Sequence, residues 1–511
     1  MRLKILKMLM IAVCIVAVVG LIYMDEKVKP VTSENKTAFQ IGNEIIYTWD
    51  DGEAEYLFLP SYASAEDVQG IADDSLQILA SKNLPTIFLE TDSGTLENIW
   101  SDKEVEENGK ITIYDKDGNL EISCGLKTVK GRGNYSFANY EKKPIAIETK
   151  EEVSLLGQGL GKNYALLSNA SDPTLIRNDI ARRMEKELSA EYDNCGVFAD
   201  VYANGEYIGT YYLCENIEVG PERININWME AQMDQVYQHS NYDSFETYED
   251  DGVKGKVMEV NPKDITGGYL VERDFKDRFE LEYDLNPSTF ITKQEEHFVV
   301  KSPRYCSAEQ ITYIQQYFEE AEVAILNKDG MHPETGISYE EYIDVEAFVK
   351  KYLVEEVTKN YDAGVSSAFY YKDSDAVDGR IKPGPVWDCD MSFGNYLDWM
   401  EYFSKDPEGI SKLAFHDHKT PWFEALYEKE EFYKAVCEMY ESEVSPFLQK
   451  LIDEEIEIYQ SELEASAKMN EIRWKVDFDN NQYFQNRVKS FDSLRLFVQE
   501  RKNYLDREWI K

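Results

Sequence analysis

The sequence predicts a mixed α/β (α+β) fold with a strand-rich N-terminal part and a helical C-terminal part. From position 84 to 148, and again from 197 to 213, short runs alternate apolar and polar residues and end at turn residues, a period of two that is typical of half-buried strands. After Ile311 the apolar residues recur at helical spacing instead. With 511 residues and 43% hydrophobic content, the chain can bury a large core and is longer than one typical domain.

The first 24 residues differ from all that follow. A basic flank precedes an apolar run from Met8 to Tyr23, which is the composition of a signal peptide or an uncleaved anchor. Because no small-x-small cleavage site follows the run, we expect a membrane anchor at residues 1–24 with the globular part outside the cell, or a secreted protein if the segment is cleaved. Residues 25–83 are expected to form a stalk and a small N-terminal extension, in which Asp50-Asp51-Gly52 predicts a hairpin turn.

Four strands are expected between residues 84 and 148, and a hairpin is expected after residue 196. Asp115-Lys-Asp-Gly-Asn119 predicts a tight turn between two of the four strands. Asn204-Gly205 is a strong signal for the turn of the later hairpin. The expected strands are Thr86–Glu90, Lys110–Tyr114, Leu120–Cys124, Lys143–Glu148, Val197–Ala203 and Glu206–Leu213.

Helices are predicted for much of the remaining chain. One helix is expected from Pro173 to Leu188, with Asp172 as its N-cap. The acidic, Tyr-rich segment from Glu230 to Gly255 predicts a mobile surface loop. We expect a main domain at residues 84–430 and a helical region at residues 431–511 that packs on it. The later elements are a helix at Val345–Val357, a strand at Ala368–Lys372 and several long helices from Phe432 to Trp509.

The charge balance argues against nucleic acid as a partner. The chain has 54 basic and 97 acidic residues, for a formal net charge of −43, and nucleic-acid binding depends on neutralising phosphates. A basic protein substrate fits this charge, although acidity also serves solubility alone. The cysteines are scattered without C-x-x-C spacing, which argues against a zinc site and favours free thiols, with room for one or two disulfides.

The segment from Val386 to Asn395 carries two acids, Asp388 and Asp390, between an apolar approach and a Gly turn. In an extended segment, residues two apart face the same way, so both carboxylates would grip one hard cation. Mg²⁺ prefers one or two protein carboxylates and leaves its other positions to water and phosphates. The pair therefore predicts a Mg²⁺ or Mn²⁺ site, with a solvated acidic loop as the alternative.

A third acid, Asp362, lies upstream at the end of the helix that begins at Val345. It is followed by a strand, a turn at Lys382-Pro383-Gly384-Pro385 and then the acid pair. The same order of parts occurs in the catalytic core of protein kinases, where one Asp meets the acceptor hydroxyl and a later Asp holds metal.

Six separated segments, in the same order as in the family, resemble the CotH family of spore coat protein H-like atypical protein kinases. The resemblance covers residues 84 to 511 roughly. Each segment alone would be weak, and their common order carries the assignment. They are Leu84–Gly94, Val129–Phe137 with Lys142–Pro144, Leu166–Asn178, Asn204–Glu215, Gly267–Glu272 and Gly384–Asn395.

The resemblance implies a bilobal, atypical protein-kinase-like fold, ATP as phosphate donor, and Ser or Thr hydroxyls of a protein as acceptor, with a basic, Ser-rich protein fitting best. Asp362 is then the candidate for accepting or orienting the acceptor proton. Asp388 is the expected principal metal ligand and Asp390 the second. The chain has no His-Arg-Asp, and Val365-Ser366-Ser367 stands where a metal-binding Asn would follow Asp362. Asn395 is expected to compensate as a metal ligand.

The segment Lys130-Gly131-Arg132-Gly133-Asn134 is the candidate loop around the phosphates. Its glycines permit close backbone approach, and its lysine and arginine supply positive charge. A bare turn has the same pattern.

Lys143, on the following strand, is the candidate catalytic lysine, while Lys142 beside it would point to the opposite face. Glu215 and Glu272 end apolar strand runs, where an acid is costly unless it is paired. We expect one to orient the lysine and the other to border the nucleotide; edge-strand glutamates in solvent are the alternative.

Two other functions compete with a kinase. The first is a non-catalytic surface protein that keeps the kinase fold as an interaction or assembly platform, and it predicts weak or absent nucleotide binding. The second is a glycoside hydrolase, which would need two acids facing one another across a cleft.

Overall fold

The computed structural model describes residues 38–510, apart from 65–67, 69–74, 195, 239–240, 251, 396–405, 416–417, 420 and 476–486. The expected anchor at residues 1–24 lies outside the described residues. Within the described part of the chain, no helix is both long enough and apolar enough to cross a membrane.

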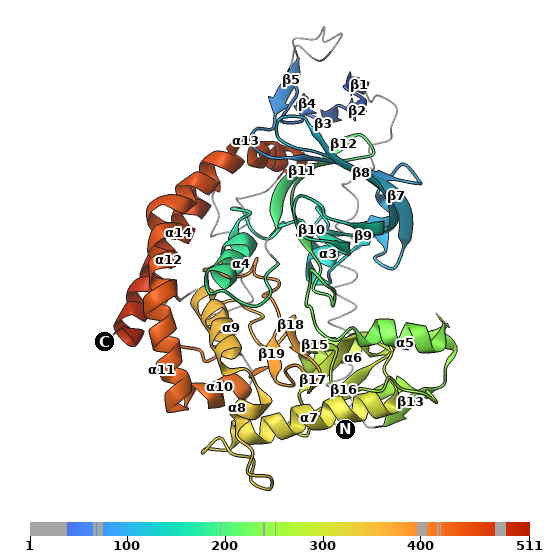
Figure 1. The fold of residues 1–511 in the computed structure, drawn as a ribbon. Helices are drawn as coiled ribbons and strands as arrows, with labels where there is room; N and C mark the ends of the chain where they lie inside the picture. The colour runs from blue at the N-terminus through green and yellow to red at the C-terminus, as the bar shows by residue number, and fades with distance from the viewer. Residues whose placement is uncertain are drawn as a thin grey trace, which may run out of the picture.

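Seven strands close into a barrel in the upper half of Figure 1, and they include every strand expected between residues 84 and 213. Neighbours pair antiparallel except β6 and β11, which are parallel. The inward side chains are apolar and fully buried, as at Ile87, Ile111 and Val129, so the predicted alternation is confirmed. In barrel order the strands are β10 (Gly161–Leu167), β12 (Glu206–Glu215), β11 (Val197–Ala203), β6 (Thr86–Thr91), β7 (Glu106–Tyr114), β8 (Leu120–Gly131) and β9 (Ile145–Val153).

Both predicted turns of the barrel are confirmed. Asp115 accepts hydrogen bonds from the backbone N–H of Asp117 at 2.9 Å and of Asn119 at 2.8 Å. Asn204 and Gly205 have φ angles of 50° and 84°, the left-handed pair that a tight β-hairpin turn requires.

A second sheet of seven antiparallel strands lies in the lower half of Figure 1. Helix α7 (Ala308–Leu326) packs on β14 and β16, and α9 (Val345–Thr358) packs on β19. In order the strands are β13 (Thr247–Asp250), β14 (Val253–Lys256), β16 (Thr289–Ile291), β17 (His297–Ser302), β15 (Tyr269–Asp274), β18 (Ala368–Lys372) and β19 (Ile381–Pro383).

The C-terminal helices run along one side of the molecule and reach both halves (Figure 1). Helix α11 (Glu430–Met439) packs on α9, while α13 (Ile456–Trp474) packs on barrel strand β12. One hydrophobic core contains residues from before and after position 430, including Leu353, Phe432 and Trp509. The helices after residue 430 therefore complete this core. The series also includes α10 (Pro421–Tyr427), α12 (Ser445–Lys450) and α14 (Arg487–Trp509).

Short elements fill the rest of the described chain. The predicted hairpin at Asp50-Asp51-Gly52 is confirmed, because β3 (Trp49–Asp50) pairs antiparallel with β4 (Glu55–Leu59). The other short elements are β1 (Ala38–Ile41), β2 (Glu44–Tyr47), β5 (Leu76–Ala80), β20 (Ala414–Phe415), β21 (His418–Lys419), α2 (Glu97–Ser101), α3 (Tyr135–Asn139), α6 (Lys276–Glu282), α8 (Tyr339–Tyr342) and single helical turns at Tyr242–Ser244 and Tyr283–Leu285.

The helix predicted from Pro173 begins four residues later than Pro173, as α4 (Arg177–Glu187). Leu175 has a φ of 69°, a left-handed conformation that interrupts a helix. Asp172 still accepts the backbone N–H of Arg177 at 2.9 Å, but it also accepts the N–H of Thr174 at 2.9 Å and pairs with the Arg177 guanidinium. Its carboxylate thus closes a turn before the helix.

The mobile loop predicted for Glu230–Gly255 is wrong. This segment holds most of α5 (Met229–Tyr237) and the hairpin of β13 and β14. Met229 and Met233 are buried, and their sulfurs accept from the side-chain amide of Gln310 at 2.7 and 3.5 Å. The acidic composition predicted a mobile loop, but Met229 and Met233 are buried, so this part of the segment is a helix packed against the rest of the protein.

Candidate functional site

A cavity of about 690 Å³ is lined by residues of both the barrel and the seven-stranded sheet, a size typical of sites for small-molecule ligands. It brings together most of the residues predicted from the sequence. The barrel side contributes Lys130, Gly131, Arg132, Gly133 and Asn134, and the sheet side contributes Glu272, Asp362, Asp388 and Asp390.

Sheet geometry explains why Asp362 and Asp388 meet. Strands β18 and β19 are antiparallel neighbours, so the segment before β18 and the segment after β19 emerge at the same edge. Asp362 lies in the first segment and Asp388 in the second.

The extended backbone expected at the acid pair is wrong. Asp388 has a φ of 54° and Asp390 lies in a turn, so the strand alternation does not apply. Both residues nevertheless line the cavity. Asp388 accepts a hydrogen bond from the Ser367 hydroxyl at 3.2 Å, and Asp390 accepts one from the Ser171 hydroxyl.

Burial and mutual repulsion perturb these acids. Burial, reinforced by the charge of Asp388, raises the pKa of Asp362 to about 7. Burial and Asp388 also raise the pKa of Asp390 to about 6, although the hydrogen bond from Ser171 opposes the shift. Like charges packed this closely disfavour ionisation, and a bound cation would relieve that cost.

Asn395 does not line the cavity among the described residues. Its buried side-chain amide donates to the carbonyl oxygens of Asp390 at 2.7 Å and Ser171 at 3.0 Å. The Asn395 amide nitrogen thus braces the loop that carries Asp388 and Asp390.

The glycine loop connects β8 to α3. A Cβ at Gly131 would collide with the Phe137 ring, and Gly133 has a φ of 79°. These two glycines are thus required by the packing and the turn of the loop itself. The Arg132 guanidinium lies over the Trp387 ring at 5.1 Å, and burial lowers its pKa against the opposing effect of Asp388.

Asn134 connects the glycine loop to helix α6, which belongs to the sheet half. Its side-chain oxygen accepts from Lys103 Nζ at 2.7 Å, and its side-chain nitrogen donates to Glu282 Oε1 at 2.7 Å. Asn134 occupies the N-cap position of α3, yet its side chain caps no helix N–H. All three bridging residues line the cavity.

Two cations that the sequence reasoning missed, Lys301 and Arg278, line the sheet side of the cavity. Lys301 Nζ lies 2.8 Å from Glu272 Oε2. Burial opposes ionisation of Glu272, but Lys301 and then Arg278 lower its pKa below the ordinary value. The available signal was a lysine in the apolar strand run Phe298-Val-Val-Lys301.

Arg278 belongs to a small hydrogen-bonded array. Its guanidinium donates to the Ser366 hydroxyl at 3.2 Å, and Ser366 in turn donates to Asp274 Oδ1 at 2.6 Å. Burial, with the nearby charge of Glu272, raises the pKa of Asp274 to about 7. Ser366 lies four residues after Asp362 in the chain, and both Ser366 and Arg278 line the same cavity as Asp362.

The structure does not bring Lys143 or Lys142 into this cavity. Lys143 donates to the carbonyl of Phe137. Lys142 is buried and donates to the carbonyls of Ser168 at 2.8 Å and Thr210 at 2.5 Å, and burial lowers its pKa to about 7. Strand β9 begins only at Ile145, so the alternation expected for the two lysines does not hold.

Glu215 also lies outside the cavity lining. It pairs with Arg223 at 2.7 Å, and burial raises its pKa to about 7. Its partner is therefore an arginine from the following loop, and neither candidate lysine pairs with it.

No set of three His, Cys, Asp or Glu side chains in the described ranges is arranged to hold a metal ion. The acids at the cavity would thus have to share a cation with water or a ligand.

The comparison with known families matches a family described as CotH kinase protein over residues 129–505. The matched range begins in β8, ends in α14 and contains Asp362, Asp388 and Asp390. No curated protein matches the chain.

Proposed function

Because the chain belongs to the CotH kinase family, we propose that it is a protein kinase that transfers the γ-phosphate of ATP to Ser or Thr of a protein at or outside the cell surface. The supporting observation is that one cavity is lined by Asp362 and Asp388 from the sheet side and by the cationic glycine loop from the barrel side. A barrel and a sheet that share a cavity also fit a bilobal, kinase-like arrangement.

The donor set fits a hard divalent cation. Asp388 and Asp390 offer carboxylate oxygens, the ligands that Mg²⁺ and Mn²⁺ prefer, and each accepts a hydrogen bond from a serine hydroxyl. When bound with ATP, the ion would neutralise phosphate charge and orient the phosphates. Asn395 keeps only a bracing role in this proposal, since its amide nitrogen is engaged with the loop carbonyls.

The lining also fits a triphosphate. Lys130, Arg132, Arg278 and Lys301 are spread over both walls, where guanidinium and ammonium groups can contact phosphate oxygens. In this proposal Lys301 with Glu272 supplies the charge that the sequence reasoning assigned to Lys143. Glu272 borders the nucleotide.

Asp362 is the proposed proton acceptor. With a pKa of about 7, its carboxylate suits proton transfer near neutral pH. The acceptor oxygen bonds to the γ-phosphorus, the bond from that phosphorus to the bridging oxygen of ADP breaks, and the hydroxyl proton passes to Asp362. The net charge of −43 supports a basic, Ser-rich protein as the acceptor. The N-terminal segment would hold the enzyme at the membrane.

The test is transfer of labelled γ-phosphate by the purified full chain with Mg²⁺ or Mn²⁺ onto a basic, Ser-rich protein. Asp362→Asn and Asp388→Asn should each reduce transfer by at least about 10²-fold, the scale of a lost general base or metal ligand. Asp453→Asn, an exposed acid of the C-terminal helices, is the matched control and should transfer normally.

Transfer that survives in Asp388→Asn would overturn the metal assignment. If the wild type neither transfers phosphate nor binds ATP with either metal, the kinase proposal fails and the non-catalytic platform becomes the better function.

A further inference from the structure

Helix α4 contacts the acid-bearing loop, defined here as residues 386–392, at three backbone positions. Arg177 Nε donates to the carbonyl of Ser392 at 3.0 Å. The Asn178 side-chain oxygen accepts the N–H of Cys389 at 2.8 Å. Both carboxylate oxygens of Glu185 accept the N–H of Val386 at 3.1 Å.

Two of these contacts, those of Asn178 and Glu185, come from one face of the helix. Asn178, Arg182 and Glu185 are spaced i, i+4 and i+7, which places them on a single stripe. The Arg182 guanidinium lies 5.0 Å from the Trp387 ring centre, between the two hydrogen-bonded sites. Along this face, Asn178, Arg182 and Glu185 thus contact Cys389, Trp387 and Val386 in turn.

The three hydrogen-bonding side chains of the helix, Arg177, Asn178 and Glu185, are almost completely buried, with exposed fractions of 1–4%. Burying polar side chains is costly unless their groups are satisfied. The loop has no strand partner, so its backbone N–H groups also need acceptors. The N–H groups of Val386 and Cys389, two residues before and one residue after Asp388, find them on α4.

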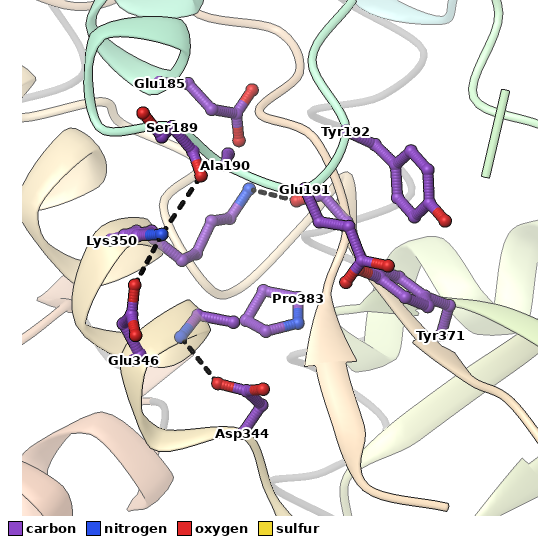
Figure 2. Close-up of a pocket in the computed structure, with 13 residues that line it drawn as sticks. Glu185, Ser189, Ala190, Glu191, Tyr192, Asp344, Glu346, Lys350, Tyr371 and Pro383 are labelled. Atoms are coloured by element: carbon purple, nitrogen blue, oxygen red, sulfur yellow. Dashed lines mark hydrogen bonds and ion pairs between the residues drawn. The ribbon is translucent and has the colours of Figure 1, made fainter. Parts of the chain in front are cut away.

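Helix α4 is itself held from three other directions. Asp179 accepts from the hydroxyls of Tyr212 in the barrel, at 2.7 Å, and of Tyr459 in α13. Arg183 donates to Glu455 at 2.9 Å. Just beyond the end of α4, the carbonyl of Ser189 accepts from Lys350 of α9 at 3.0 Å, as Figure 2 shows beside Glu185.

We propose that Asn178 and Glu185 are positioning residues that hold the backbone on either side of Asp388 and so aim its carboxylate into the cavity. A residue with a φ of 54° has an unfavourable backbone conformation, and the two flanking hydrogen bonds keep it in that conformation. The consequence for metal binding rests on the proposed function, whereas the positioning of the loop does not.

The experiment uses a matched pair in the full chain, Glu185→Gln and Glu185→Met. Burial raises the pKa of Glu185 to about 8, so the neutral Gln is a close mimic that keeps an acceptor oxygen. Met has similar length and no strong acceptor. Asn178→Leu is the second variant, and Glu187→Met, at an exposed position of the same helix, is the control.

Two readouts are measured: hydrogen exchange of the peptide that covers residues 386–392, and Mn²⁺ affinity by electron paramagnetic resonance. In Glu185→Met and Asn178→Leu we expect exchange to accelerate and Mn²⁺ affinity to fall, each by up to about tenfold, the effect of one lost hydrogen bond. Glu185→Gln and Glu187→Met should match the wild type in both.

Unchanged exchange in both Glu185→Met and Asn178→Leu would overturn the proposal. Faster exchange with wild-type Mn²⁺ affinity would overturn it as well, because the loop would then not aim the ligand. If the wild type binds no Mn²⁺, the metal part of the proposed function fails, and the exchange result alone decides whether α4 positions the loop.

Discussion

Replacing Lys301 with Met tests the most consequential difference between the sequence-based site and the structure. Lys301 of β17 and Glu272 of β15 lie on antiparallel neighbours, with Nζ 2.8 Å from the carboxylate. The Glu272 side chain is 8% exposed and the Lys301 side chain 40%. The substitution leaves a nearly buried carboxylate whose other cation, Arg278, lies 3.9 Å away.

The expected loss of unfolding free energy follows from this geometry. A hydrogen bond to a charged group contributes about 1.5–3 kcal/mol, and the exposure of Lys301 places this pair near the lower end. We therefore expect Lys301→Met to cost about 1.5 kcal/mol in urea unfolding. Adding Glu272→Gln should recover much of that loss, because the double variant buries no unpaired charge.

Measuring ATP affinity distinguishes an effect of Lys301 on function from its effect on stability. If Lys301 contacts phosphate, Lys301→Met should weaken ATP binding by about tenfold or more in calorimetry, and the double variant should remain equally weak although its stability recovers. Lys301→Arg should keep most of the affinity. Wild-type ATP affinity in Lys301→Met would refute the assignment of this lysine to the phosphates, and a coupling energy near zero in the double-mutant cycle would refute the stabilising pair.

Three further outcomes are expected. Arg501→Met should lower the free energy of unfolding by about 3–5 kcal/mol, because it leaves Glu356 buried without the guanidinium that now lies 2.9 Å from its carboxylate. Urea unfolding measures this loss. A loss below about 1 kcal/mol, roughly the value of an exposed ion pair, would contradict the prediction. Gly133→Ala should weaken ATP binding while lowering the free energy of unfolding by only about 1–2 kcal/mol. The reason is that residue 133 has a φ of 79° and that an added Cβ would lie 2.8 Å from Ser136 Oγ. Wild-type ATP affinity in this variant would contradict a phosphate role for the loop. Thermal stability should fall from pH 5 to pH 9, because burial holds the pKa of Glu185 at about 8 against an ordinary 4.5. Between these two pKa values the folded state binds more protons than the unfolded state. The free energy of unfolding therefore falls as the pH rises, until Glu185 is ionised in the folded state above about pH 8. Calorimetry of wild type and Glu185→Gln checks it, with a smaller fall expected in the variant.

The regular parts of the fold could be predicted from local patterns. Strands β6, β11 and β18 and helix α9 lie within two residues of their predicted bounds, because apolar periodicity and turn residues act over short distances. Two predictions failed where composition and spacing did not determine the backbone. The helix predicted from Pro173 is interrupted at Leu175, which has a left-handed conformation. In the acidic segment, Met229 and Met233 of a helix are buried and accept hydrogen bonds from Gln310 of α7.

The site could be predicted in part for the same reason. The acids Asp362 and Asp388 were recognisable from their order around a strand and a turn, and the pairing of β18 with β19 is what brings them to one edge. Which lysine lies at the cavity could not be predicted from the local sequence. Lys142 and Lys143 lie just before β9 with carbonyl partners, whereas Lys301 enters the cavity because β17 pairs with β15.

Residue identity and short-range spacing were thus sufficient to identify the acids, the glycine loop and most strands, since these depend on backbone preferences and on which side chains carry charge. The choice of cations, the bracing role of Asn395 and the contacts of α4 with residues 386–392 depend on residues that lie up to 224 positions apart in the chain, as for Asn395 and Ser171. Such contacts are set by how helices and sheets pack around one core, and no local pattern specifies that packing.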